Sequence, residues 1–105
     1  MADWFDVARA DDVPPGTAYA ADVEGTFIAV VNVDGAFFAV EDLCTHDGGD
    51  LATGDVEGDE IVCPRHGARF CVRTGAVKAP PAYEDIRTFP VRVEGGVVQV
   101  QLPEA

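Results

Sequence analysis

The sequence predicts an all-β fold, a sandwich or barrel of short antiparallel strands. Short β-rich runs, each followed by turn residues, recur along the chain, and no apolar stripe of helical spacing is longer than a couple of turns. The run 97–102 alternates, placing Val98, Val100 and Leu102 on one face. With 105 residues the chain suits one domain, which we expect to span residues 1–105.

The first three predicted strands cover residues 17–24, 26–33 and 36–43. Asp34-Gly35 separates the second and third apolar runs, and such a pair favours a type I′ turn with positive φ at both positions. These two strands are therefore predicted to form a hairpin. Residues 27–31 are apolar at every position, which indicates a central strand that is covered on both faces.

The later predicted strands cover residues 60–63, 69–73, 86–94 and 97–102. Turn residues at this spacing are typical of a sandwich or barrel. Pro90 interrupts the third of these runs, and because proline donates no ladder hydrogen bond it indicates an edge strand or the start of a strand.

The chain is strongly acidic, with 19 acidic residues against 7 Lys and Arg and a formal net charge of -12. Such a surface repels phosphate backbones and anionic lipid headgroups, so we expect neither nucleic-acid nor membrane partners. The N-terminal residues carry no basic segment followed by an apolar run, and no apolar stretch approaches the roughly 20 residues that span a bilayer. A cytoplasmic location is the resulting expectation.

Two Cys-His pairs lie close together in the middle of the chain. Cys44 and His46 are separated by one residue, and Cys63 and His66 by two. Thiolate and imidazole are ligands for zinc and for iron, and four of them in two short pairs indicate a metal site. Zinc motifs usually space paired cysteines by two to four residues and group their histidines, so mixed pairs fit zinc poorly. A zinc-stabilised interaction module remains the alternative.

The pattern C-x-H followed by C-x-x-H-G resembles the Rieske [2Fe-2S] signature. The stretch 63–70, the following Arg-Thr-Gly, a proline pair and the closing run 89–100 are similar to small Rieske ferredoxins of bacterial ring-hydroxylating oxygenases. This resemblance implies an antiparallel β-sandwich or barrel. A cluster-binding subdomain of two loops, at about residues 43–79, would stand on a basal β domain formed by the remainder.

The same resemblance implies the ligands and the cofactor. One [2Fe-2S] Rieske cluster would be held by Cys44 and Cys63 on the buried iron and by His46 and His66 on the outer iron. Replacing two thiolates by neutral imidazoles makes the cluster less negative, so that adding an electron becomes easier.

The resemblance also implies an electron carrier and not an enzyme. The protein would take single electrons from a flavin-dependent NAD(P)H ferredoxin reductase and deliver them to a terminal non-haem iron oxygenase. We expect transient docking and a monomer. A catalytic site with two histidines and a carboxylate would find no histidine left over, because both belong to the signature. The alternative is a Rieske-like small or accessory subunit of a nitrite reductase.

The resemblance places the reduction potential near the bottom of the Rieske range. High-potential respiratory relatives carry a Ser and a Tyr whose hydroxyl groups hydrogen-bond to sulfur, where this chain has Ala68 and Phe70. Those relatives also link the two loops by a disulfide. The corresponding positions here are Gly49 and Arg65, so that bridge cannot form.

Four of the seven bases lie within or just after the second Cys-His pair: Arg65, Arg69, Arg73 and Lys78. They either balance the acids between residues 41 and 60 or form a basic or mixed-charge docking patch.

Pro80-Pro81 is expected in a loop that covers the cluster or in a plain turn. Cys71 is interpreted as a buried strand residue. Trp4 and Phe5 are interpreted as core anchors.

Overall fold

A computed structural model describes residues 3–45 and 47–102 of the chain. His46, one of the four predicted ligands, lies outside the described residues. Within them the chain is nearly all β, which confirms the predicted fold class, and no helix has the length and apolar character needed to cross a membrane. In chain order the elements are β1 (Trp4–Arg9), η1 (Ala10–Asp12), β2 (Ala18–Val23), β3 (Thr26–Val33), β4 (Ala36–Glu41), β5 (Val56–Glu57), β6 (Glu60–Val62), β7 (Arg69–Cys71), β8 (Val77–Ala79), β9 (Thr88–Phe89), β10 (Val91–Glu94) and β11 (Val97–Gln101).

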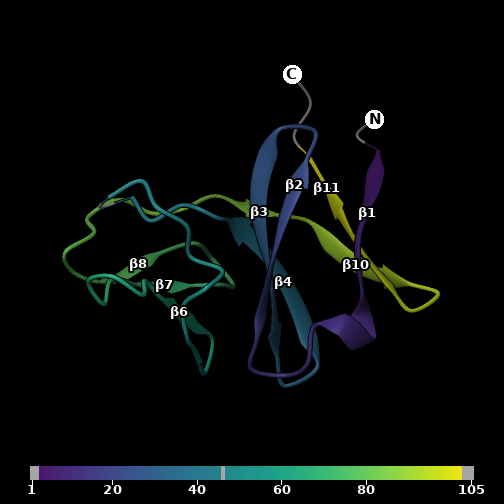
Figure 1. Cartoon of the computed structure of the whole chain (residues 1–105), viewed down its shortest axis with the longest axis horizontal. Coiled ribbons are helices and arrows are strands. Elements are labelled where there is room, and N and C mark those ends of the chain that lie inside the picture. The colour runs from purple at the N-terminus through teal and green to yellow at the C-terminus, as the bar shows by residue number, and fades with distance from the viewer. Residues whose placement is uncertain (1–2, 46, 103–105) are drawn as a thin grey trace.

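The strands form three antiparallel sheets. Their strand orders are β1-β11-β10, β2-β3-β4-β9 and β5-β6-β7-β8. In Figure 1 the β2-β3-β4-β9 sheet stands in the middle, with β1, β10 and β11 on one side of it and the β6-β7-β8 strands on the other. The β5-β6-β7-β8 sheet falls within residues 56–79, between the two Cys-His pairs and just after them.

Strand β3 contributes to two separate hydrophobic cores. Ile28 and Val30 pack in one core with Val98 and Val100 of β11 and their neighbours. Ala29, Val31 and Val33 point the other way, into a core that also contains the two cysteines of the signature. The prediction of a central strand covered on both faces is thus confirmed for residues 28–31. It is wrong for Phe27, which is 63% exposed near the start of the strand.

The β3-β4 turn has the predicted geometry. Asp34 has φ 52° and Gly35 has φ 95°, and the flanking strands pair from Val33 and Ala36 onward. Strand β4 ends at Glu41, two residues earlier than predicted, because the chain then turns into the loop that carries Cys44.

Two features of the basal sheets differ from the sequence predictions. Strand β1 was not predicted, and it pairs with β11. The predicted strand 86–94 is divided at Pro90, so that β9 pairs with β4 and β10 pairs with β11. Pro90 has no backbone N–H to donate, and it lies where the chain passes from one sheet to the next.

The two N-terminal aromatic residues have different environments. Phe5 packs against the core beneath β11, as predicted. Trp4 is half-buried and not a core anchor, because the Arg92 guanidinium lies over its ring, 4.3 Å from the ring centroid.

Candidate metal centre

The first Cys-His loop, residues 44–53, is folded back on itself by backbone hydrogen bonds. Cys44 N donates to Gly49 O at 2.7 Å, and Gly48 N donates to Cys44 O at 2.7 Å. Farther along, the amides of Leu51 and Ala52 donate to Asp42 Oδ1 at 2.6 and 2.9 Å. These bonds hold the Cys44 side chain inward, where it is fully buried.

The second Cys-His loop, residues 63–70, is a tight turn between β6 and β7. Cys63 N donates to Ala68 O at 2.7 Å, and Gly67 N donates to Cys63 O at 3.1 Å. Gly67 has φ +77°, a conformation that glycine adopts without steric cost. Cys63 is 1% exposed, whereas His66 at the tip of the turn is exposed. One side chain of this pair is therefore directed into the core and the other lies at the surface.

A glycine brings the end of the first loop against the strand that leads into the second. A Cβ atom on Gly54 would lie 1.8 Å from the Val62 carbonyl oxygen, and Val62 directly precedes Cys63. The Val62 amide donates to Asp55 O at 2.9 Å in the same place. Only a residue without a side chain permits this approach.

The two cysteine sulfurs meet inside the protein. Among the described residues, one set of ligand atoms all within 4.8 Å of one another comes from Cys44, Asp47 and Cys63. Two sulfur ligands on one tetrahedral metal, each with a bond of about 2.3 Å, lie roughly 3.8 Å apart. The thiol pair therefore fits a shared metal. His66 is not a member of that set.

Asp47 carries the negative charge next to the thiols, and Arg65 balances it. The hydrogen bond from Arg65, followed by that from the Gly49 amide, holds the pKa of the Asp47 carboxyl well below its ordinary value. The same pairing raises the pKa of the Arg65 guanidinium. Both groups are therefore charged at any ordinary pH.

The arginines within and after the second Cys-His pair form ion pairs with acidic residues between positions 47 and 60. Arg65 pairs with Asp47 and Asp50, Arg69 pairs with Glu57 and Glu60, and Arg73 lies 3.5 Å from Asp59. This agrees with the interpretation as charge balance and leaves little net positive charge for a basic docking patch.

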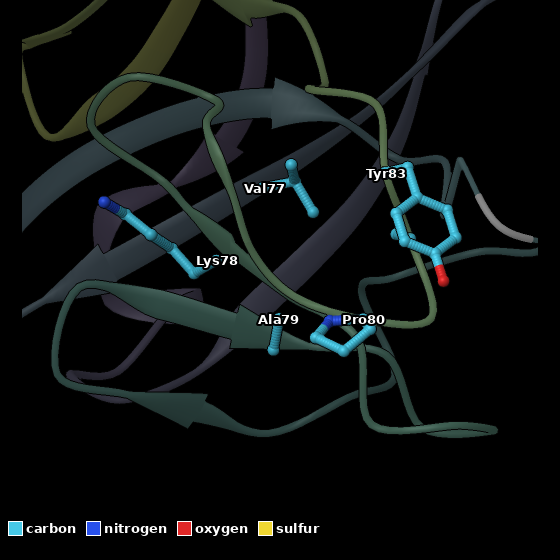
Figure 2. Close-up of a pocket in the computed structure, with 6 residues that line it drawn as sticks. Val77, Lys78, Ala79, Pro80 and Tyr83 are labelled. Atoms are coloured by element: carbon cyan, nitrogen blue, oxygen red, sulfur yellow. The ribbon is translucent and has the colours of Figure 1, made fainter.

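The loop that begins at Pro80-Pro81 and continues to Glu84 lies against the first Cys-His loop. Thr45 Oγ1 donates to Glu84 O at 2.7 Å, and Ala82 packs in the core that contains both cysteines. A shallow apolar pocket opens beside this loop, with Tyr83 at one side and Lys78 at the other (Figure 2). Tyr83 is 85% exposed. The pocket therefore presents an aromatic ring to solvent close to the first Cys-His loop.

Two further predictions concern buried residues of the second loop and β7. Ala68 and Phe70 are fully buried in the core of the two cysteines, and neither has a hydroxyl group to donate to sulfur. Cys71 is a buried strand residue, 7% exposed, as predicted.

The position of Asp47 beside the two thiols was not predicted from the sequence. A signal was present, since an acidic residue directly follows His46 and a basic residue lies between Cys63 and His66. If the two loops share a metal, an acidic residue in one loop and a basic residue in the other are candidates for an ion pair.

Comparison with known proteins agrees with this geometry. The Rieske [2Fe-2S] domain matches residues 3–90. The biphenyl dioxygenase ferredoxin subunit of Pseudomonas sp. (strain KKS102) is 44% identical over 96 residues, covering 90% of this chain and 88% of that protein.

Solved structures show the same fold. A chain in the complex of reduced oxygenase and oxidized ferredoxin in carbazole 1,9a-dioxygenase is 38% identical, with TM-score 0.88, covering 93% of this chain and 92% of that one. The putative NADH-dependent nitrite reductase small subunit from Mycobacterium tuberculosis has TM-score 0.90 over 100% of this chain and 99% of that one. At 20% identity that likeness supports the fold alone.

The chain belongs to the Rieske [2Fe-2S] domain family. Its cofactor is a [2Fe-2S] cluster, and Cys44 and Cys63 lie in the cluster-binding region.

The close approach of Gly54 to Val62 generates a prediction. Gly54→Ala should lower the free energy of unfolding by about 3 kcal/mol or more, because the new methyl group overlaps a backbone oxygen. It should also lower the cluster content after purification. Urea unfolding and iron analysis measure both effects.

Gly58→Ala is the matched control, since a Cβ there meets no atom within 4 Å. Its positive φ of 61° should cost only about 1–2 kcal/mol and leave the cluster content unchanged. Equal loss of cluster in both variants would refute a special role for the Gly54 contact.

Proposed function

We propose that Cys44, His46, Cys63 and His66 hold the [2Fe-2S] cluster and that the chain carries single electrons between two partner proteins. The observation that carries this proposal is the pair of buried thiols, which come from two different loops and lie within 4.8 Å of each other, with His66 of the second loop exposed. We also propose one Rieske domain over residues 1–105, with a cluster-binding subdomain at about residues 43–79. The separate β5-β6-β7-β8 sheet within that range supports this division.

The burial of the residues suggests the role of each ligand. Cys44 and Cys63 lie in the core and suit the inner iron. His66 is exposed and suits the outer iron, from which an electron has a short path to the surface. The role of His46 depends on the motif alone. When bound, the cluster supplies reversible one-electron transfer.

A flavin-dependent NAD(P)H ferredoxin reductase is the proposed donor and a terminal non-haem iron oxygenase the proposed acceptor. The ferredoxin names of the relatives and the carbazole dioxygenase complex support the oxygenase as acceptor, and the reductase as donor rests on the family resemblance. The net charge of -12 favours transient docking on basic partner surfaces and disfavours nucleic acid and membranes. Tyr83 and the apolar pocket that it lines offer apolar contact area for a partner close to the first Cys-His loop (Figure 2). We further propose a cytoplasmic monomer.

Catalysis by this chain and an accessory role are less well supported. Both histidines of the sequence belong to the Rieske signature, which leaves none for a mononuclear iron site of two histidines and a carboxylate. The likeness to the nitrite reductase small subunit concerns the fold alone. The two relatives above 30% identity that are named above are a ferredoxin subunit of biphenyl dioxygenase and a chain of a carbazole 1,9a-dioxygenase oxygenase–ferredoxin complex.

Two cysteine variants test the ligand assignment and the function together. Cys44→Ala should contain no cluster and should fail to pass electrons from NADH and a flavoprotein ferredoxin reductase to cytochrome c, a one-electron acceptor. Cys71→Ala, which alters an equally buried thiol in β7, should retain both properties. Iron and acid-labile sulfide analysis measure the cluster. A full cluster in Cys44→Ala, or its loss in Cys71→Ala, would contradict the assignment.

The absence of hydroxyl groups at Ala68 and Phe70 generates a prediction about the potential. Rieske potentials span about -150 to +300 mV, and this protein should fall in the lower part of that range. Ala68→Ser with Phe70→Tyr should raise the midpoint, because hydroxyl donors stabilise the more negative reduced form. A redox titration checks both statements. A wild-type midpoint in the upper half of the range would refute the first.

A further inference from the structure

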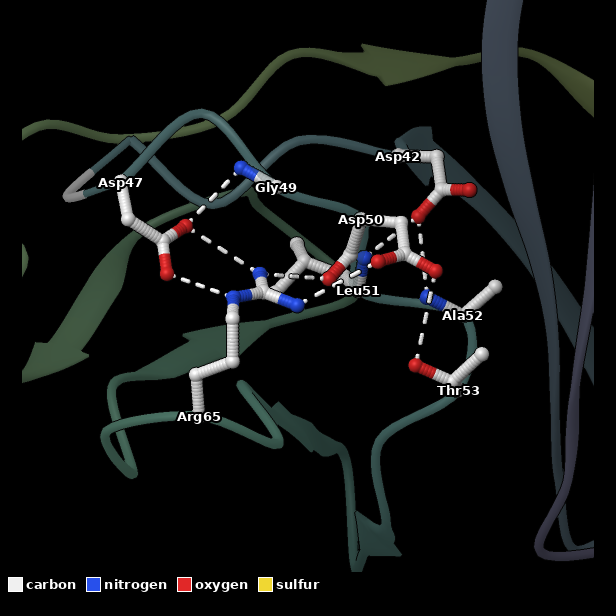
Figure 3. Close-up of polar contacts among 8 residues, drawn as sticks. All are labelled: Asp42, Asp47, Gly49, Asp50, Leu51, Ala52, Thr53 and Arg65. Carbon is white, nitrogen blue, oxygen red and sulfur yellow. Dashed lines mark hydrogen bonds and ion pairs between the residues drawn. The ribbon is translucent and has the colours of Figure 1, made fainter.

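Arg65 connects the two Cys-His loops through a single guanidinium group. It lies in the second loop, and its Nε and Nη2 atoms donate to the two carboxylate oxygens of Asp47 in the first, with Nη2 to Oδ1 at 3.1 Å. Its Nη2 also donates to Asp50 O at 2.8 Å, and its Nη1 to Asp50 Oδ1 at 3.3 Å. Figure 3 shows all these bonds converging from the first loop on one side chain. Bidentate pairing of this kind fixes orientation as well as distance.

The partner residues of Arg65 are themselves fixed to the backbone that positions Cys44. Gly49 N donates to Asp47 Oδ1 at 2.9 Å, and Gly49 O accepts from Cys44 N at 2.7 Å. The guanidinium also packs on Gly49, because a Cβ atom there would lie 2.5 Å from Arg65 Cζ. A displacement of Arg65 would therefore disturb the same turn that holds the Cys44 amide.

A backbone hydrogen bond joins the two loops at their base, where Val62 N donates to Asp55 O at 2.9 Å. Among the described residues 47–53, no backbone–backbone hydrogen bond reaches residues 63–65 or 67–68. Each loop is closed by its own bonds, and the two thiols come from different loops. The contacts of Arg65 add a link between the loops through side chains, beside the two thiols.

Arg69 provides an internal comparison. Its side chain is 35% exposed against 34% for Arg65, and it also pairs with two carboxylates, Glu57 at 2.8 Å and Glu60 at 3.4 Å. Those acids lie on β5 and β6, which the sheet already joins to β7. The two arginines thus match in exposure and charge, and they differ in whether they connect the two Cys-His loops.

We propose that Arg65 is a positioning residue, a non-covalent clamp that holds the two Cys-His loops around the cluster and neutralises Asp47 beside the two thiols. The proposal depends on the ligand assignment made above. Because the clamp is an ion pair at a partly exposed site, salt weakens it, which a covalent link between the loops would not show.

The test compares Arg65→Gln with Arg69→Gln by two measurements on the cluster-loaded protein. The first is the rate at which visible absorbance disappears in the presence of an iron chelator, at low salt and in 1 M salt. Arg65→Gln should lose its cluster about three- to tenfold faster than the wild type at low salt. Arg69→Gln should stay within about twofold.

Salt gives a second signature. In 1 M salt the Debye length falls to about 3 Å, so the wild type should lose its cluster faster and approach the Arg65→Gln rate. Arg65→Gln itself should change little. Equal rates for the two arginine variants, or a wild-type rate that salt leaves unchanged, would overturn the clamp.

The midpoint potential separates the effect of charge from the effect of position. Arg65→Gln leaves the Asp47 carboxylate unpaired near the thiols and should lower the midpoint, whereas Asp47→Asn should raise it. The double variant should return close to the wild-type midpoint and still lose its cluster quickly, because the link between the loops is absent. An unchanged midpoint in both single variants would refute the neutralising role.

These outcomes are distinguishable from failure of the proposed function. If the wild type itself binds no [2Fe-2S] cluster, the ligand assignment is wrong. If the wild type binds one and Arg65→Gln retains it as well as Arg69→Gln does, the clamp alone is wrong. Should Arg65→Gln not fold, Asp47→Asn keeps the arginine and tests the same contact through the chelator rate.

Discussion

The structure depends on the burial of both faces of strand β3. Its side chains alternate between a basal core shared with β11 and a second core that contains Cys44 and Cys63. The β2-β3-β4-β9 sheet therefore lies between the two cores, and the two Cys-His loops pack against one of its faces. Because protein cores are close-packed, this arrangement gives the loops a rigid base. Their positions relative to each other are then set by local contacts, chiefly Gly54 against Val62 and the contacts of Arg65.

Charge is distributed unevenly around this site. The chain as a whole is strongly acidic, yet Asp47, the acid beside the thiols, is paired with Arg65. Pairing limits the negative potential where an electron must be added, while the remaining acids are available to attract basic partners.

Much of the fold and the ligand motif could be predicted from the sequence, because the residues that specify them lie close together along the chain. Asp34-Gly35 specifies its turn through backbone sterics, and the apolar run of β3 indicates burial on two faces. The ligand spacing carries the family resemblance. Strand β1 was missed because its pairing with β11 joins opposite ends of the chain. The contact between Asp47 and Arg65 was missed for a similar reason, since the loops are brought together by tertiary packing and each charge alone resembles an ordinary surface residue.

The most direct test of the central claim is electron paramagnetic resonance of the dithionite-reduced protein, together with iron and acid-labile sulfide analysis. We expect two irons and two sulfides per chain and the low average g value of a cluster with two histidine ligands. A silent spectrum with one bound zinc and no sulfide would contradict it, and would leave a structural metal module in place of an electron carrier.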